Sequence, residues 1–240
     1  MTWRLLAAAV LVMLGASASA QGQHGRGDRA PRLAPGEPRS VDDVRRALDG
    51  TAGARVRAGL AKAGVSSRPT RLWLLAIKDE RRLELWASRS RGERVRVTAW
   101  SVLAASGSAG PKLREGDRQV PEGNYRIDRL NPNSAYHLSL RLDYPNADDR
   151  AWAAREGRVR LGGDIFIHGK DVSIGCLALG DRAVEELFWL AAIVGKDAFT
   201  VVIVPTDLRT RPPPRVAGAP AWTGDLYESL RRAMSGFVVD

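Results

Sequence analysis

The stretch Ile165–Cys176 reads IFIHGKDVSIGC and contains the only cysteine of the 240-residue chain and one of its three histidines. Its apolar start predicts a short buried strand that ends at His168. A thiol needs a neighbouring base to become a thiolate near neutral pH, and imidazole is the usual one. The stretch can supply both groups from one strand-turn-strand or strand-turn-helix unit, with a helix directly after Cys176. We therefore expect a reactive Cys-His pair; a buried, inert thiol is the alternative.

Composition narrows the classes of protein and of ligand. With one cysteine the chain can form no internal disulfide, and its 44% apolar content is ordinary for a globular protein. The net charge of +10 suggests a polyanionic environment, such as a cell-wall polymer or an anionic membrane surface, although an Arg-rich solvated surface would also account for it. No aromatic-basic repeat, phosphate loop or metal-ligand spacing is present, so we expect no nucleic acid, metal or cofactor.

The N-terminus has the features of a signal peptide over residues 1–20. Arg4 gives a positive start, an apolar run covers residues 5–14, and Ala18-Ser19-Ala20 is a small-residue cleavage signature. An uncleaved membrane anchor is the alternative. We expect an exported protein that works in the periplasm or cell envelope.

The remaining chain divides into four parts by composition. We expect a Gly/Pro/Arg-rich linker, an N-terminal helical segment capped by Ser40, a catalytic domain, and a Pro/Arg-rich tail with a C-terminal helix; these cover residues 21–39, 40–64, 70–205 and 206–240. The helical segment is either a hairpin or one broken helix. The C-terminal helix, which Thr223 would cap, either packs on the body or contacts a surface.

The pattern over residues 70–205 predicts a mainly β domain with flanking helices, an α+β fold. Residues 72–77 form a near-continuous apolar run, typical of a central strand, and helical spacing recurs after Asp181. Alternation over residues 136–142 predicts a strand. It places Tyr136 and three leucines in the core, and His137, Ser139 and Arg141 on one face that is either a cleft or solvated.

Several motifs together resemble one known family. They are I-H-G-x-x-x-S-x-G-C at 167–176, Gly110-Pro111-Lys112, Pro121–Tyr125, Asn131–Ser134, His137–Ser139 and Tyr144–Asn146. They are similar to the L,D-transpeptidase catalytic domain, or YkuD, family, and most to its YafK-type branch, over most of the mature chain. Many members have a second histidine before the Gly-Cys pair, where this chain has Ile174. That departure puts in doubt an oxyanion-binding or orienting role for a side chain at this position. The backbone N–H groups would still be available to bind an oxyanion.

The resemblance implies a β-sandwich or barrel with a helix after the catalytic cysteine, and it assigns roles. Cys176 would attack a peptide carbonyl, His168 would act as base, and backbone N–H groups at Gly175 and Cys176 would form an oxyanion hole. Ser173 would orient His168 or serve ordinary turn chemistry. The implied substrate contacts are Lys112, Tyr136, His137, Arg141 and Gly169; for Lys112, exposure to water is the alternative.

The implied substrate is the tetrapeptide stem of peptidoglycan. Similar proteins attack the carbonyl of its third residue and release D-alanine. The acceptor is a diaminopimelate amine, an outer-membrane lipoprotein lysine or water, so a hydrolase of the same linkage is the first alternative. The resemblance also implies carbapenems as acylating inhibitors and no metal or organic cofactor. We expect a monomer. A non-catalytic wall-binding module is the second alternative. A thiol redox protein would usually have a C-x-x-C pair, which this chain lacks.

Overall fold

The computed structural model describes residues 37–89 and 92–238. The predicted signal peptide at 1–20 and most of the predicted linker lie outside these residues. Within the described ranges, no helix combines the length and the apolar character needed to cross a bilayer.

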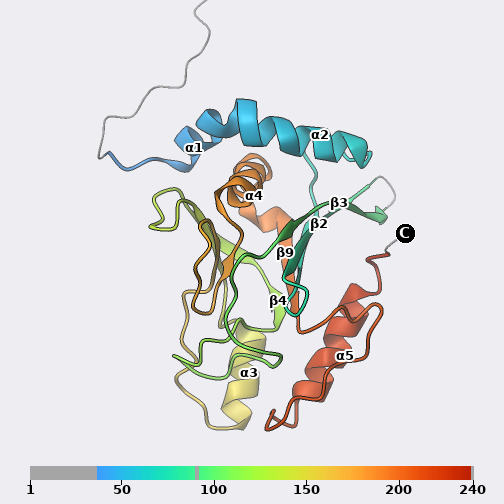
Figure 1. Ribbon diagram of the computed structural model, residues 1–240. Coiled ribbons are helices and arrows are strands. Elements are labelled where there is room, and N and C mark those ends of the chain that lie inside the picture. Colours follow the sequence, from blue (N-terminus) through green and yellow to red (C-terminus); the bar gives the residue numbers. More distant parts are fainter. Residues whose placement is uncertain (1–36, 90–91, 239–240) are drawn as a thin grey trace, which may run out of the picture.

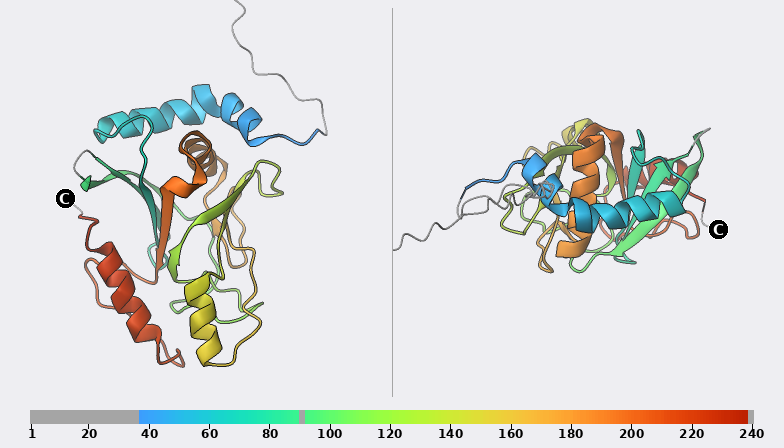
Figure 2. Two further views of the ribbon diagram at one scale, coloured as in Figure 1. Left: turned by 180° about the vertical axis from the view of Figure 1, so that it is seen from behind. Right: turned by 90° about the horizontal axis from the view of Figure 1, so that it is seen from above.

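The described strands form two sheets (Figures 1 and 2). The five-stranded sheet has the order β3-β2-β1-β9-β4 and the four-stranded sheet the order β5-β6-β7-β8. Helices flank both sheets, which confirms the predicted α+β class. The strands are β1 (Leu72–Ile77), β2 (Arg82–Ser88), β3 (Arg94–Ser101), β4 (Gly123–Tyr125), β5 (Ile127–Asn131), β6 (Ser139–Leu142), β7 (Phe166–His168), β8 (Leu177–Ala178) and β9 (Phe199–Val204).

Strand β1 is the centre of the larger sheet, as its apolar run predicts. It pairs with β2 in antiparallel and with β9 in parallel orientation, and all six of its residues are buried. Alternate side chains enter two separate cores. The first core lies between the sheets, and the second is closed by α5 (Thr223–Met234). A strand with both faces covered has no reason to alternate apolar and polar residues.

The C-terminal helix α5 packs on the body of the protein. Figure 1 shows α5 beside the five-stranded sheet. The buried side chains of the helix, Tyr227, Leu230 and Met234, recur at helical spacing and belong to the core on the outer face of that sheet. The predicted cap was wrong: Trp222 is the N-cap, and Thr223 is the first residue inside the helix. Trp222 already has helical backbone angles, so the winding begins one residue earlier than the side-chain pattern suggests.

The N-terminal segment is one broken helix rather than a hairpin. It consists of α1 (Val41–Leu48), a π-helical turn (Asp49–Gly53) and α2 (Ala54–Lys62). Ser40 caps it in a reciprocal capping box with Asp43, as expected for a serine before an apolar-periodic run. The segment lies across α4 (Asp181–Val194), with which α1 and α2 are in contact (Figure 2).

Helix α4 connects this segment to the four-stranded sheet. Its predicted apolar face is buried, including Leu187, Phe188 and Ala191, and the helix contacts β5, β6 and β7. A 3-10 turn at Lys196–Ala198 links it to β9, and the remaining helix, α3 (Ala147–Arg155), begins at an Asn146 capping box. Because α4 supports the sheet that contains His168, it fixes that strand from behind.

The predicted strand over residues 136–142 begins later than expected. β6 starts at Ser139, and Tyr136 is 46% exposed rather than part of the core. His137 has a φ of +72°, a left-handed conformation that ends the alternation of faces. Leu138, Leu140 and Leu142 are buried as predicted.

Candidate active site

The pairing of β7 with β8 places the predicted Cys-His pair on one face of the sheet. The strands are parallel, with Ile167 opposite Leu177 and His168 opposite Ala178. One residue further back, this register sets Cys176 opposite Phe166, which shares a face with His168 because side chains alternate with a period of two. The unit is therefore strand-turn-strand, and the helix expected directly after Cys176 begins only at Asp181, after β8.

The ring of His168 is held in one tautomer. Its Nδ1 lies 2.6 Å from the carbonyl oxygen of Gly169, and a carbonyl can only accept, so Nδ1 has the proton. The unprotonated Nε2 is then the atom that can accept a proton from a nucleophile. His168 is 3% exposed, and burial lowers the pKa of its imidazole below the ordinary value. At neutral pH we expect a neutral ring, which is the form that acts as a base.

Burial also favours the neutral form of the Cys176 thiol. The thiol donates to the carbonyl oxygen of Asp164 at 3.6 Å, and within the described part of the chain it makes no hydrogen bond to His168. Burial raises the pKa of Cys176, an effect opposed by the Phe166 amide and by the positive charge of Lys112. Burial therefore favours the pair of thiol and imidazole over that of thiolate and imidazolium.

Both backbone amides expected to form the oxyanion hole donate to side-chain hydroxyl groups. The Gly175 N–H donates to Ser106 Oγ at 2.6 Å, and the Cys176 N–H donates to Ser173 Oγ at 3.0 Å. The Ser173 hydroxyl in turn donates to the Cys176 carbonyl at 2.7 Å. Of the two roles expected for Ser173, this structure shows the hydrogen bonding of a tight turn. Gly175 has a φ of +89°, which explains why glycine precedes the cysteine.

Tyr136 and Gly169 lie beside the imidazole. The Tyr136 ring is tilted over His168, with 4.7 Å between ring centroids. A Cβ atom at Gly169 would lie 2.7 Å from the Tyr136 carbonyl oxygen and 2.6 Å from Asp181 Oδ1. Only a glycine lets the chain after His168 pass this close to its neighbours.

Arg141 is on the face that contains the pair, and His137 is not. β6 pairs with β7 so that Arg141 lies opposite Phe166, and Arg141 bonds to Asp128 Oδ2 at 2.7 Å and Asp164 Oδ1 at 3.2 Å. His137 instead lies before β6, where its Nε2 is 3.0 Å from Glu185 Oε1. The shared face predicted for these two residues was wrong, because the left-handed residue His137 turns the chain.

Lys112 is buried rather than solvated. It is 9% exposed, and its Nζ bonds to Asp117 Oδ1 at 2.6 Å and to the Arg114 carbonyl at 2.9 Å. A substrate carboxylate at this ammonium group would compete with Asp117. The aspartate accepts further bonds from the backbone of its own loop, so the lysine also helps to order this loop.

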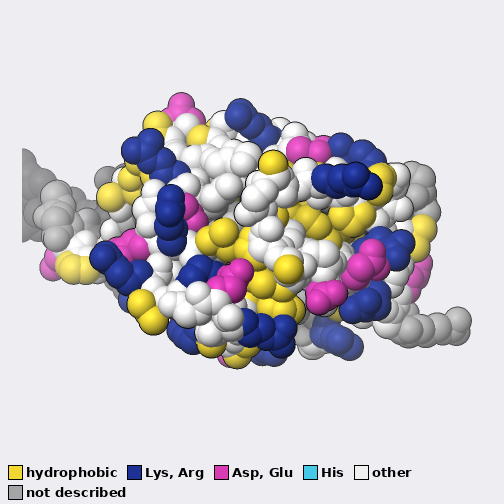
Figure 3. All heavy atoms as spheres, turned by 90° about the horizontal axis from the view of Figure 1, so that it is seen from below, with side chains coloured by type: hydrophobic (Ala, Val, Ile, Leu, Met, Phe, Trp, Pro, Cys, Tyr) yellow, Lys and Arg dark blue, Asp and Glu magenta, His cyan; other side chains and the backbone are white. Residues whose placement is uncertain are grey.

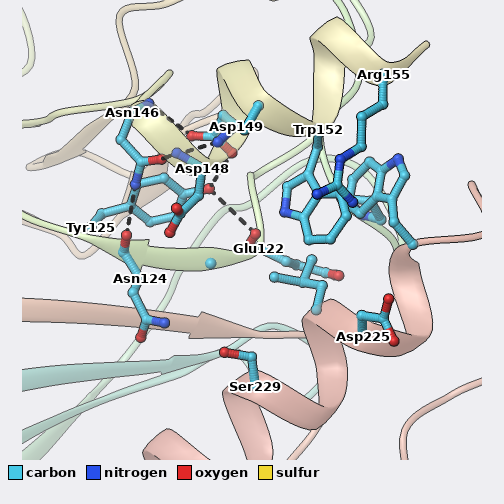
Figure 4. A pocket seen from close by; sticks show the side chains of 15 residues that line it. Glu122, Asn124, Tyr125, Asn146, Asp148, Asp149, Trp152, Arg155, Asp225 and Ser229 are labelled. Atoms are coloured by element: carbon cyan, nitrogen blue, oxygen red, sulfur yellow. Dashed lines mark hydrogen bonds between the residues drawn. The ribbon is translucent and has the colours of Figure 1, made fainter.

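A separate cavity of about 270 Å³ lies between α3 and α5. Figure 4 shows Asn146, Asp148 and Asp149 from α3 on one side and Asp225 and Ser229 from α5 on the other. In the space-filling view of this end, hydrophobic side chains gather near the centre, with charged groups around them (Figure 3). Neither member of the Cys-His pair lines this cavity.

An aromatic column closes one side of this cavity. Trp152 stacks on Trp222 with 5.0 Å between centroids, and the guanidinium of Arg155 lies 4.4 Å from the Trp152 centroid. Through the stack of Trp152 on Trp222, the start of α5 packs against α3. Among the described residues, no cluster of three or more His, Cys, Asp or Glu side chains could hold a metal ion.

Sequence reasoning missed two residues that contact the candidate site and a third that binds His137, a predicted substrate contact outside the face of the pair. Ser106 accepts from the Gly175 amide, the Asp164 carbonyl accepts from the thiol, and Glu185 binds His137. A loop without periodicity at 105–123 was the one signal for Ser106. Nothing local marks Asp164 or Glu185, whose partners are distant in the sequence.

A family model of the L,D-transpeptidase catalytic domain, YkuD, matches residues 71–204, more than half of the chain. The chain belongs to the YkuD family. Its matched range contains both sheets and the Cys-His pair, and this membership confirms the resemblance on which the site residues were chosen.

Two curated relatives and several solved structures are similar to this YkuD protein. YafK of Escherichia coli strain K12 is 34% identical over 140 residues, which cover 56% of this chain and 54% of YafK; YafK of strain O157:H7 matches equally. The chain thus spans about half the length of these relatives. The helical cell shape determining protein Pgp2 from Campylobacter jejuni is 21% identical, with a TM-score of 0.47 over 63% of this chain and 56% of Pgp2. L,D-transpeptidase 1 of Mycobacterium tuberculosis is 17% identical, with a TM-score of 0.31 over 56% of this chain and 62% of that one.

Proposed function

We propose that this chain is an exported cysteine acyltransferase that acts on the stem peptides of peptidoglycan. The observation that carries the proposal is the register of β7 with β8, which, extended by one residue, puts Cys176 on the face of His168; Nδ1 of this histidine is bound to the Gly169 carbonyl. This arrangement leaves Nε2 as the base on the face that contains the thiol. Family membership supplies the substrate class, and a net charge of +10 suits a carboxylate-rich wall polymer.

The first half of the reaction forms a thioester. As the sulfur of Cys176 bonds to the peptide carbonyl carbon, its proton moves to Nε2 of His168 and the carbonyl electron pair moves onto oxygen. The tetrahedral species collapses by breaking the C–N bond, and the imidazolium protonates the departing amine. For a tetrapeptide stem cleaved after its third residue, the amine that leaves is D-alanine.

The second half transfers the acyl group to an acceptor. The neutral imidazole takes a proton from an amine or from water, whose lone pair attacks the thioester carbonyl and expels the thiolate. The thiolate recovers a proton from the imidazolium. An amine acceptor, from diaminopimelate or a lipoprotein lysine, makes the protein a transferase, and water makes it a hydrolase.

Arg141 is the group best placed to bind a substrate carboxylate. It shares the face of the pair, and one of its two partners, Asp164, has a side chain that is 77% exposed. A carboxylate of the stem could replace Asp164 on the guanidinium and form a bidentate pair. Tyr136 would cover His168 at the rim of the site, and Lys112 would supply positive charge near the sulfur.

Product analysis by mass spectrometry tests this proposal. Wild-type protein and the Cys176→Ala variant would be incubated with disaccharide-tetrapeptide and with a lipoprotein-linked muropeptide. Cys176-dependent loss of D-alanine with dimer formation supports a transpeptidase, and release of the lipoprotein remnant without dimer supports a hydrolase of that linkage. Turnover by Cys176→Ala, or no turnover of either substrate by a well-folded wild-type protein, would reject thiol acyl transfer.

A further inference from the structure

The loop after β3 reaches the residue before the nucleophile. Leu103 N–H donates to the Ala178 carbonyl at 2.8 Å, and Ala104 forms a β-bridge with Ala178, so the chain is fixed along the edge of β8. Two residues on, Ser106 Oγ accepts from the Gly175 amide at 2.6 Å and donates to the Arg118 carbonyl at 2.7 Å. The Ser106 hydroxyl therefore bridges Gly175 and the distant end of its own loop.

In the proposed reaction the Gly175 N–H is an oxyanion donor, and in this structure that N–H is already bound by the Ser106 hydroxyl. Donors of an oxyanion hole lie about 2.7–3.1 Å from the developing negative oxygen. The Ser106 oxygen lies 2.6 Å from the Gly175 nitrogen, so a substrate oxygen and Ser106 compete for the same N–H. The Cys176 amide is different, because its partner Ser173 belongs to the same tight turn. Of the two hydroxyl groups, only that of Ser106 comes from a segment distant in sequence from Cys176.

We propose that Ser106 is a positioning residue that blocks the Gly175 oxyanion donor and withdraws when the substrate carbonyl enters. The inference rests on the proposed thiol acyl transfer, in which this N–H stabilises the tetrahedral intermediate. The hydroxyl must give up the bond to Gly175, while the bond to Arg118 holds it close by. Removing it therefore exposes the donor and raises the rate of thiol acylation by about three- to tenfold, the range expected for one neutral hydrogen bond.

Two thiol reagents separate this role from a general effect on the sulfur. p-Nitrophenyl acetate acylates Cys176 through a tetrahedral oxyanion and releases p-nitrophenolate. Iodoacetamide alkylates the same sulfur by displacing iodide, without any oxyanion. Both rates would be measured on the full chain as wild type, Ser106→Ala, Ser106→Thr and Ser108→Ala, with Cys176→Ala as the background. Ser108 lies in the same loop, and its hydroxyl contacts only Ala109 and Gln119 among the described residues, so it is the matched control.

Ser106→Ala should accelerate acylation while alkylation stays within about twofold of wild type. Ser106→Thr, which restores the hydroxyl, and Ser108→Ala should behave like wild type in both reactions. Unchanged or slower acylation in Ser106→Ala would overturn the inference, and so would equal changes in both reactions, because these indicate an altered thiol rather than an exposed donor. If p-nitrophenyl acetate acylates the wild-type protein but no peptide is turned over, the proposed substrate is rejected, while the comparison of Ser106→Ala with wild type still tests the inference.

Discussion

Replacing Gly169 by alanine should disturb the fold and the site together. The added Cβ would lie 2.6 Å from Asp181 Oδ1 and 2.7 Å from the Tyr136 carbonyl oxygen. Neither atom can retreat easily, because the carboxylate accepts from the Lys170 amide at 2.9 Å and the carbonyl accepts from the Leu138 amide at 3.0 Å. Overpacking costs about 1–3 kcal/mol. Alanine gains about 0.4–1 kcal/mol over glycine through the unfolded chain, so we expect a net loss of about 1 kcal/mol.

Gly163→Ala is the matched control for this substitution. A Cβ there would meet nothing within 4 Å, so this variant should be as stable as wild type or slightly more stable. Urea unfolding measures both changes, and acylation by p-nitrophenyl acetate measures the site. Because the Gly169 carbonyl holds Nδ1 of His168, Gly169→Ala should also slow acylation by at least about tenfold. Equal urea midpoints and equal acylation rates for the two variants would refute the packing argument.

Three further results are expected. Leu230→Ala should lower the free energy of unfolding by about 2–5 kcal/mol, because this fully buried side chain holds α5 to the sheet. The rate of thiol alkylation should stay that of wild type. A loss below about 0.5 kcal/mol would show that α5 is not part of the folding unit. The rate of alkylation by iodoacetamide should still be rising with pH where an ordinary thiol levels off, since burial raises the pKa of Cys176, and a plateau by pH 8 would contradict this. Burial raises the pKa of Asp149 to about 6, so the folded state binds this proton more tightly than the unfolded chain does. The free energy of unfolding should therefore fall as pH rises from about 4 to 6. In urea titrations, Asp149→Asn should remove this pH dependence.

The parts of the fold that sequence could predict are those with local signals. The continuous apolar run of β1 and the apolar face of α4 each predict burial, and Ser40 before a helical pattern predicts the helix cap. The partner of an amphipathic helix is not encoded locally, so the pattern of α5 was equally consistent with a surface and with the sheet. His137 shows a different limit: its left-handed conformation interrupts the strand, and alternation of residue types cannot reveal a backbone angle.

For the candidate site, the sequence singled out the two groups proposed to react, Cys176 and His168, but not the residues around them. The proposed nucleophile and base lie in one twelve-residue stretch, where the motif is visible. The contacts of Ser106 with Gly175 and of Glu185 with His137 join residues far apart in the chain, and serine and glutamate are common at any surface. Tertiary packing alone decides which of many such residues meets the site.

Burial acts on both members of the pair, and the two shifts have one consequence. It raises the pKa of the thiol and lowers that of the imidazole, so both favour the neutral pair over the ion pair. Proton transfer to His168 before attack is then less favourable than in a site that holds a thiolate. The sulfur would lose its proton as it bonds to carbon, and the energy of the negative oxygen becomes decisive in that step. In the proposed reaction, the Gly175 N–H that binds Ser106 in this structure would become available to the developing oxygen only after that hydroxyl moves away.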